Sequence, residues 1–78
     1  MAENGYAVVL FHSTQGAIKA ERALVKAGFT VKLIPTPRQL SSNCGTALRC
    51  SWDEIDGVRS ALGDAKAEFD RIHRLPVR

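Results

Sequence analysis

The 78 residues predict an α+β protein whose elements follow the order strand, helix, strand, strand, helix, strand. Three observations carry this prediction. The run Tyr6–Phe11 is continuously apolar, as in a strand that is buried on both faces. The segment Phe29–Pro35 alternates between apolar and polar residues, as in a strand with one face in water. Two further segments carry apolar residues at helical spacing.

The first helix is expected to follow the first strand directly. Ser13 and Thr14 are both suitable N-cap residues. Gly28 is suited to the end of the helix, where the backbone turns left-handed. The apolar stripe between these ends consists of Ala17, Ala20, Leu24 and Ala27.

The second half of the chain repeats the pattern. A third strand is expected over Thr46–Trp52, and its core-facing residues are Leu48, Cys50 and Trp52. The segment Ser51–Glu54 has the form of a capping box, and Asp53 is a second cap candidate. A helical stripe follows at Ile55, Val58, Leu62 and Ala65. A last strand spans about residues 68–75, before Pro76 ends it.

Two interleaved right-handed crossovers of this kind give a four-stranded antiparallel sheet in the order 4-1-3-2, with both helices on one face. This is the ferredoxin-like two-layer sandwich, and we expect one domain over residues 1–78 with an ordered core of about 6–76. So small a domain has little room for a deep cavity, which favours a carrier, adaptor or ligand-binding module over a self-sufficient enzyme. The first strand is apolar on both faces although helices cover only one. We therefore expect an exposed apolar patch, formed either by Tyr6, Val8 and Leu10 or by Ala7, Val9 and Phe11, which would suit a homodimer.

The charge of the chain is uneven. The formal net charge is +3, and residues 1–50 alone carry +4. This surplus is compatible with an anionic partner such as RNA or an acidic protein surface, although a solvated basic face is the commoner explanation of such a surplus. RNA binding is not expected, because the third strand, T-A-L-R-C-S-W, lacks the stacking aromatics of RNA-recognition domains. The chain shows neither a membrane-spanning run nor a signal peptide, so we expect a cytoplasmic protein with reduced thiols.

The two cysteines differ in their settings. Cys50 alternates with apolar residues and is expected to pack in the core as a small hydrophobe. A disulfide with Cys44 fits poorly, because four strand steps alone span roughly 13 Å and a disulfide needs Cα atoms within about 7 Å. A metal site also fits poorly, because only His12 could reach Cys44, and His73 lies too far along the last strand. We expect neither a metal nor a cofactor.

Cys44 lies in a long polar loop between the second and third strands. The topology brings this loop to the same end of the sheet as the start of the first helix. Arg38 and the helix N-terminus would lower the pKa of the thiol, and Ser41 and Asn43 could donate hydrogen bonds to an anionic sulfur. Gly45 leaves room for an incoming group, and His12 is the one candidate acid or base. An inert loop cysteine remains an open alternative.

The segment P-T-P-R-Q-L-S-S-N-C-G-T-A-L-R, Pro35–Arg49, resembles the signature of a family of small bacterial selenium/sulfur carrier-like domains. In that pattern a proline-and-arginine stretch leads through a serine to a Cys-Gly pair. The likeness extends over about residues 6–65. It implies that Cys44 carries a persulfide-type sulfur or selenium.

The leading hypothesis is therefore a sulfur or selenium relay in a transfer pathway, not a stand-alone enzyme. A cysteine desulfurase-like donor would load Cys44, and an acceptor protein would receive the cargo. The alternative is a small regulatory or dimerisation module that binds a small ligand and has no thiol chemistry. In that case Cys44 would be dispensable.

Overall fold

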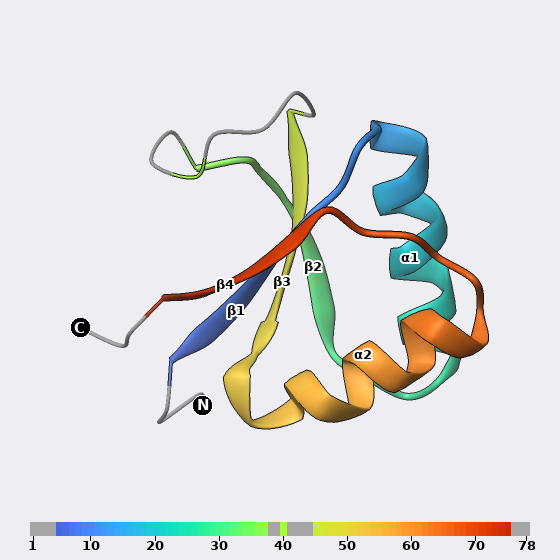
Figure 1. Ribbon diagram of the computed structural model, residues 1–78. Coiled ribbons are helices and arrows are strands. Elements are labelled where there is room, and N and C mark those ends of the chain that lie inside the picture. The colour runs from blue at the N-terminus through green and yellow to red at the C-terminus, as the bar shows by residue number, and fades with distance from the viewer. Residues whose placement is uncertain (1–4, 38–39, 41–44, 76–78) are drawn as a thin grey trace.

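The computed structural model describes residues 5–37, 40 and 45–75. Its elements are β1 (Tyr6–Leu10), α1 (Thr14–Lys26), β2 (Val31–Pro35), β3 (Thr46–Ser51), the short 3₁₀ helix η1 (Trp52–Glu54), α2 (Ile55–Asp64) and β4 (Arg71–Leu75). The sheet has the order β2-β3-β1-β4, and each neighbouring pair is antiparallel. Read from the other edge, this is the predicted order 4-1-3-2. The α+β class and the order of the elements along the chain are thus as predicted (Figure 1).

Helix α1 begins and ends where the sequence indicates. The Ser13 hydroxyl oxygen accepts a hydrogen bond from the Gly16 backbone N–H at 3.1 Å, so Ser13 and not Thr14 is the N-cap. Gly28 follows the helix with a φ of +95°, a left-handed conformation that glycine adopts without strain. Ala27 is exposed, unlike the rest of the predicted stripe, because it is the C-cap and lies past the last full turn.

The start of the second helical segment differs from the expected capping box. Trp52 belongs to η1 and not to β3. The Ser51 hydroxyl oxygen accepts from the backbone N–H of Asp53 at 3.3 Å, so it caps η1. Glu54 is the N-cap of α2 and makes no side-chain capping bond there. The extra turn lets β3 end and α2 begin within a few residues.

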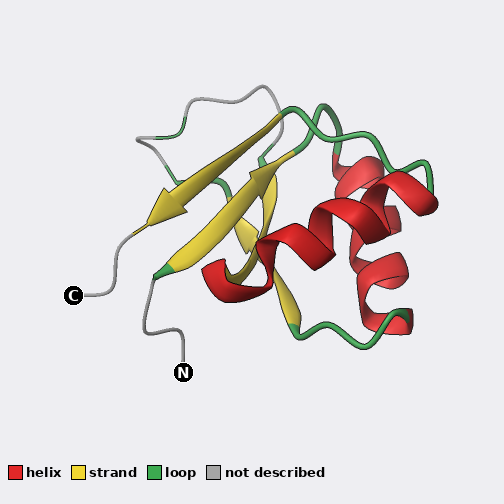
Figure 2. Cartoon of the chain, turned by 60° about the horizontal axis from the view of Figure 1, so that its bottom comes forward, coloured by secondary structure: helices red, strands yellow, loops and turns green. Residues whose placement is uncertain are grey.

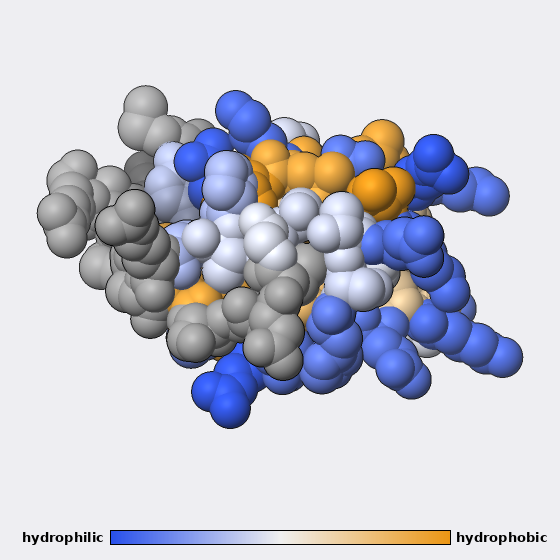
Figure 3. Space-filling view, turned by 90° about the horizontal axis from the view of Figure 1, so that it is seen from above, coloured by the Kyte–Doolittle hydropathy of each residue, from blue (hydrophilic) through white to orange (hydrophobic). Residues whose placement is uncertain are grey.

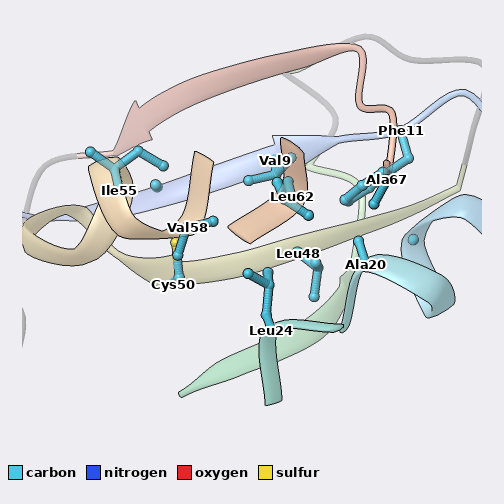
Figure 4. Packing of buried hydrophobic residues seen from close by; sticks show 12 residues of the cluster. Val9, Phe11, Ala20, Leu24, Leu48, Cys50, Ile55, Val58, Leu62 and Ala67 are labelled. Atoms are coloured by element: carbon cyan, nitrogen blue, oxygen red, sulfur yellow. The ribbon is translucent and has the colours of Figure 1, made fainter. Parts of the chain in front are cut away.

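Both helices cover the same face of the sheet, as Figure 2 shows. The main core lies between these two layers and contains Val9, Phe11, Leu24, Leu48, Val58 and Leu62, all nearly inaccessible to solvent. Figure 4 shows side chains from both helices meeting those of β1 and β3. Residues at alternate positions of β1 point into this core, as the pattern of a strand buried on both faces requires.

A second, smaller cluster lies on the other face of the sheet. Val8, Leu10 and Ala47 are buried there together with Leu40, and Ile34 and Leu75 pack against them. Val8 is 0% exposed and Leu10 1% exposed. The expectation that one alternate set of β1 would form an exposed apolar patch is therefore wrong for these two residues. Leu40, from the segment between β2 and β3, packs over them, which local sequence patterns do not reveal.

Candidate functional site

Several connections meet at one end of the sheet. The Thr36 backbone N–H donates to the Gly45 carbonyl oxygen at 3.0 Å, which closes the base of the segment between β2 and β3. The hydroxyl oxygens of Thr14 and Thr46 lie 3.5 Å apart, so the start of α1 lies beside the start of β3. The Asp70 backbone N–H donates to the Leu10 carbonyl oxygen at 2.7 Å. For the described residues, the predicted meeting of the three loops is confirmed (Figure 1).

The N-terminus of α1 gives this end a positive partial charge. The first-turn amide groups point out of the helix, and the helix dipole adds to their field. Ser13 satisfies one of these donors, that of Gly16. No acidic side chain lies in the first turn to neutralise the end. This local electrostatics favours an anionic group nearby.

The predicted site residues are only partly within the described residues. Cys44, Arg38, Ser41 and Asn43 lie outside them. Gly45 is exposed, and a Cβ atom built on it meets no atom within 4 Å. Its φ is not in the left-handed region, so the backbone does not require glycine there. The position has open space around it, and the use of that space by an incoming group stays a prediction.

His12 is exposed between β1 and α1, where it borders a hollow of about 300 Å³. Lys19, Lys66 and Glu68 also line this hollow. The sequence analysis assigned neither lysine to the site. Lys66 reaches this end because it lies in the turn after α2, where it adopts a φ of +55°. A lysine that follows a helix is so common that its charge alone gives no signal.

Figure 3 looks onto this end of the molecule. The described surface between the grey atoms is mainly pale or blue, with an orange hydrophobic strip to one side.

Cys50 is buried and carries a free thiol. Desolvation by burial and, to a lesser extent, the negative charge of Glu54 together raise the pKa of the Cys50 thiol from 9.0 to about 11. Its sulfur lies under α2 near Val58 (Figure 4). The prediction that Cys50 is a packing residue is confirmed, and a disulfide through Cys50 is excluded because its thiol is free.

In the part of the chain that the structure describes, no three or more His, Cys, Asp or Glu side chains gather where they could hold a metal ion. In the same part, neither helix has the length and apolar character needed to cross a bilayer.

The fold is thus a small α+β domain in which Gly45 and the N-terminus of α1 lie at the same end of the sheet. Residues 6–74 match the family described as "Putative Se/S carrier protein-like", and the chain belongs to this family. This confirms the family that the sequence analysis predicted.

A curated relative is the uncharacterized protein YtiA of Escherichia coli strain K12. It is 44% identical over 43 residues, which are 55% of this chain and 47% of the relative. The chain therefore aligns with about half the length of this relative, whose own function is not described.

Proposed function

We propose that the protein is a sulfur or selenium carrier that holds its cargo on Cys44 and passes it to a partner protein. The observation that carries this proposal is the contrast between the two cysteines. Cys50 is 4% exposed and has a pKa raised to about 11, so its nucleophilic thiolate is scarce at neutral pH. The family is described as selenium/sulfur carrier-like, and the chain has two cysteines. Since Cys50 is unsuited to the task, Cys44 is the candidate for carrying the cargo.

The proposed step is a thiolate exchange that needs no oxidant or reductant. The Cys44 thiolate attacks the outer sulfur of a persulfide on a cysteine desulfurase-like donor. The sulfur–sulfur bond of the donor breaks, and the donor leaves as a thiolate. Cys44 then bears the persulfide, and an acceptor protein receives its outer sulfur by the same exchange.

The surroundings support an anionic sulfur at this end of the sheet. The amide end of α1, with no acidic residue in its first turn, stabilises negative charge. In the proposal, Arg38 and Ser41 assist the thiolate, Gly45 keeps space for the incoming sulfur, and His12 is a proton donor or acceptor. We propose that this site stands on a ferredoxin-like sandwich and works in the cytoplasm, where thiols stay reduced.

The test is intact-mass spectrometry after incubation with a cysteine desulfurase and cysteine. The proposal predicts that the wild-type protein gains the mass of one sulfur atom, that Cys50→Ala gains it equally, and that Cys44→Ser gains none. Loading of Cys44→Ser at the wild-type level would contradict it. The absence of any adduct on the wild-type protein would favour the regulatory-module alternative.

A further inference from the structure

The sheet face opposite the helices carries a cluster of basic side chains. Residues that pair directly across an antiparallel ladder point to the same face. Val8 faces away from the helices, and Arg49 and His73 are its partners on the two neighbouring strands. Lys32 is the partner of Arg49, and Arg71 is the partner of Leu10. We call Lys32, Arg49, Arg71 and His73 the basic face.

No strand position on this side of the described sheet holds a carboxylate. The remaining positions are occupied by Tyr6, Val8, Leu10, Ile34, Ala47, Ser51 and Leu75. Lys32 and Arg49 lie directly opposite each other, an arrangement of like charges that destabilises a sheet. Among the described residues, neither side chain forms an ion pair. The fold thus places two like charges at paired strand positions, and a bound anionic partner would reduce their repulsion.

Arg49 is held in a defined position. Its guanidinium carbon lies 4.9 Å from the centroid of the Tyr6 ring, a cation–π contact. Beside these two residues lies a hollow of about 600 Å³, which Lys32 and Thr30 also line. Glu54 of η1 also lines this hollow, so the hollow has one carboxylate and the two cationic side chains of Lys32 and Arg49. The net charge of the side chains that line the hollow is therefore positive.

We propose that the basic face docks an acidic protein surface, and this inference rests on the proposed carrier function, which requires protein partners. The cations lie on either side of Val8 and Leu10, which Leu40 covers, and they extend from β2 to β4, about 14 Å at the usual strand spacing. That width exceeds one carboxylate or phosphate and suits several carboxylates of a protein. Single-stranded nucleic acid is disfavoured, because Tyr6 is the sole Phe, Tyr or Trp at the described strand positions of this face and Arg49 already stacks on it.

A fluorescent oligo-glutamate peptide serves as the probe, and its anisotropy is titrated with the full-length protein. Binding is expected at about 20 mM salt and is expected to be mostly lost at about 0.3 M, because salt screens exposed charges. Lys32→Glu should weaken binding about tenfold, since it reverses one charge of the face. Arg22→Glu makes the same change of net charge on the exposed side of α1 and should weaken binding much less.

The stability of the two variants separates docking from misfolding. Lys32→Glu replaces a repulsive pair by an attractive one and should not lower the urea midpoint. Equal weakening by Lys32→Glu and Arg22→Glu, or no binding at low salt, would overturn the inference. Tighter binding of an oligothymidylate of equal charge would overturn it in favour of nucleic acid. The titration is repeated with Cys44→Ser. If this variant binds the peptide but is not loaded with sulfur, docking and sulfur carriage are separate properties. The docking proposal and the carrier proposal can then be refuted independently.

Discussion

The backbone N–H of Thr36 donates to the carbonyl oxygen of Gly45 at 3.0 Å, so this hydrogen bond joins the two ends of the segment that contains Cys44. Thr46, the next residue, lies against Thr14 at the start of α1. The base of the segment is thus fixed beside the helix N-terminus. This arrangement lets single substitutions at the base distinguish effects on the fold from effects on sulfur transfer.

Gly45→Ala should leave the free energy of unfolding unchanged to within about 0.5 kcal/mol, because the position has an ordinary φ and open space for a Cβ. If the space serves the incoming sulfur, the rate of persulfide loading should fall and should fall further in Gly45→Leu. Urea unfolding and the time course of loading by mass spectrometry check the two effects. An unchanged loading rate in Gly45→Leu would show that the space beside Gly45 is not used by the incoming sulfur.

Ser13→Ala should lower the free energy of unfolding by about 1 kcal/mol, because the amide of Gly16 loses its partner. Gln15→Ala is the control, since Gln15 is exposed in the same turn. Ser13→Asp keeps the capping oxygen and should keep the stability. Its negative charge opposes an anionic sulfur at the helix end, so loading should slow. Loading as fast as wild type in Ser13→Asp would argue against a role for the helix N-terminus.

Leu40→Ala should lower the free energy of unfolding by about 2 kcal/mol, because Leu40 is 9% exposed and covers Val8 and Leu10. Ile18→Ala serves as control, because Ile18 is 37% exposed on α1 and should change stability little. Chemical denaturation measures both. A cost for Leu40→Ala no larger than that for Ile18→Ala would show that Leu40 does not anchor the loop.

The Cys50 thiol should make stability fall at high pH. Its folded pKa is about 11 against an ordinary 9.0, so the native state holds the proton more tightly. The contribution is complete below pH 9 and is lost as the pH rises through 11, by roughly 2–3 kcal/mol. Denaturation at pH 8 and pH 11 should show a larger loss for the wild type than for Cys50→Ala. Equal losses would mean that Cys50 titrates normally in the folded protein.

The sequence predicted the parts of the fold that depend on local patterns. The Ser13 cap, the Gly28 turn and the burial of Cys50 all follow from spacing and residue type. The assignment of Trp52 to β3 was wrong, because alternation continues through the residue where the 3₁₀ turn begins. Sequence periodicity does not distinguish the last residue of a strand from the first residue of a tight turn.

The remaining differences come from contacts between residues far apart in the chain. Leu40 lies in a polar loop, and its packing against Val8 depends on how that loop crosses the sheet. Lys66 reaches the site end only through the turn after α2. The signature residues Cys44, Arg38 and Ser41 were assigned from sequence and resemblance, and their roles stay predictions.

We expect Cys44, and not Cys50, to carry the transferred sulfur. Trypsin separates the two cysteines, because cleavage after Arg38, Arg49 and Arg59 gives one peptide of residues 39–49 and another of residues 50–59. The native protein is loaded by a desulfurase with isotopically labelled cysteine, alkylated, digested and mapped by tandem mass spectrometry. The labelled sulfur is expected on Cys44 in peptide 39–49 alone. Label on Cys50 in peptide 50–59, or equal label on both peptides, would contradict it.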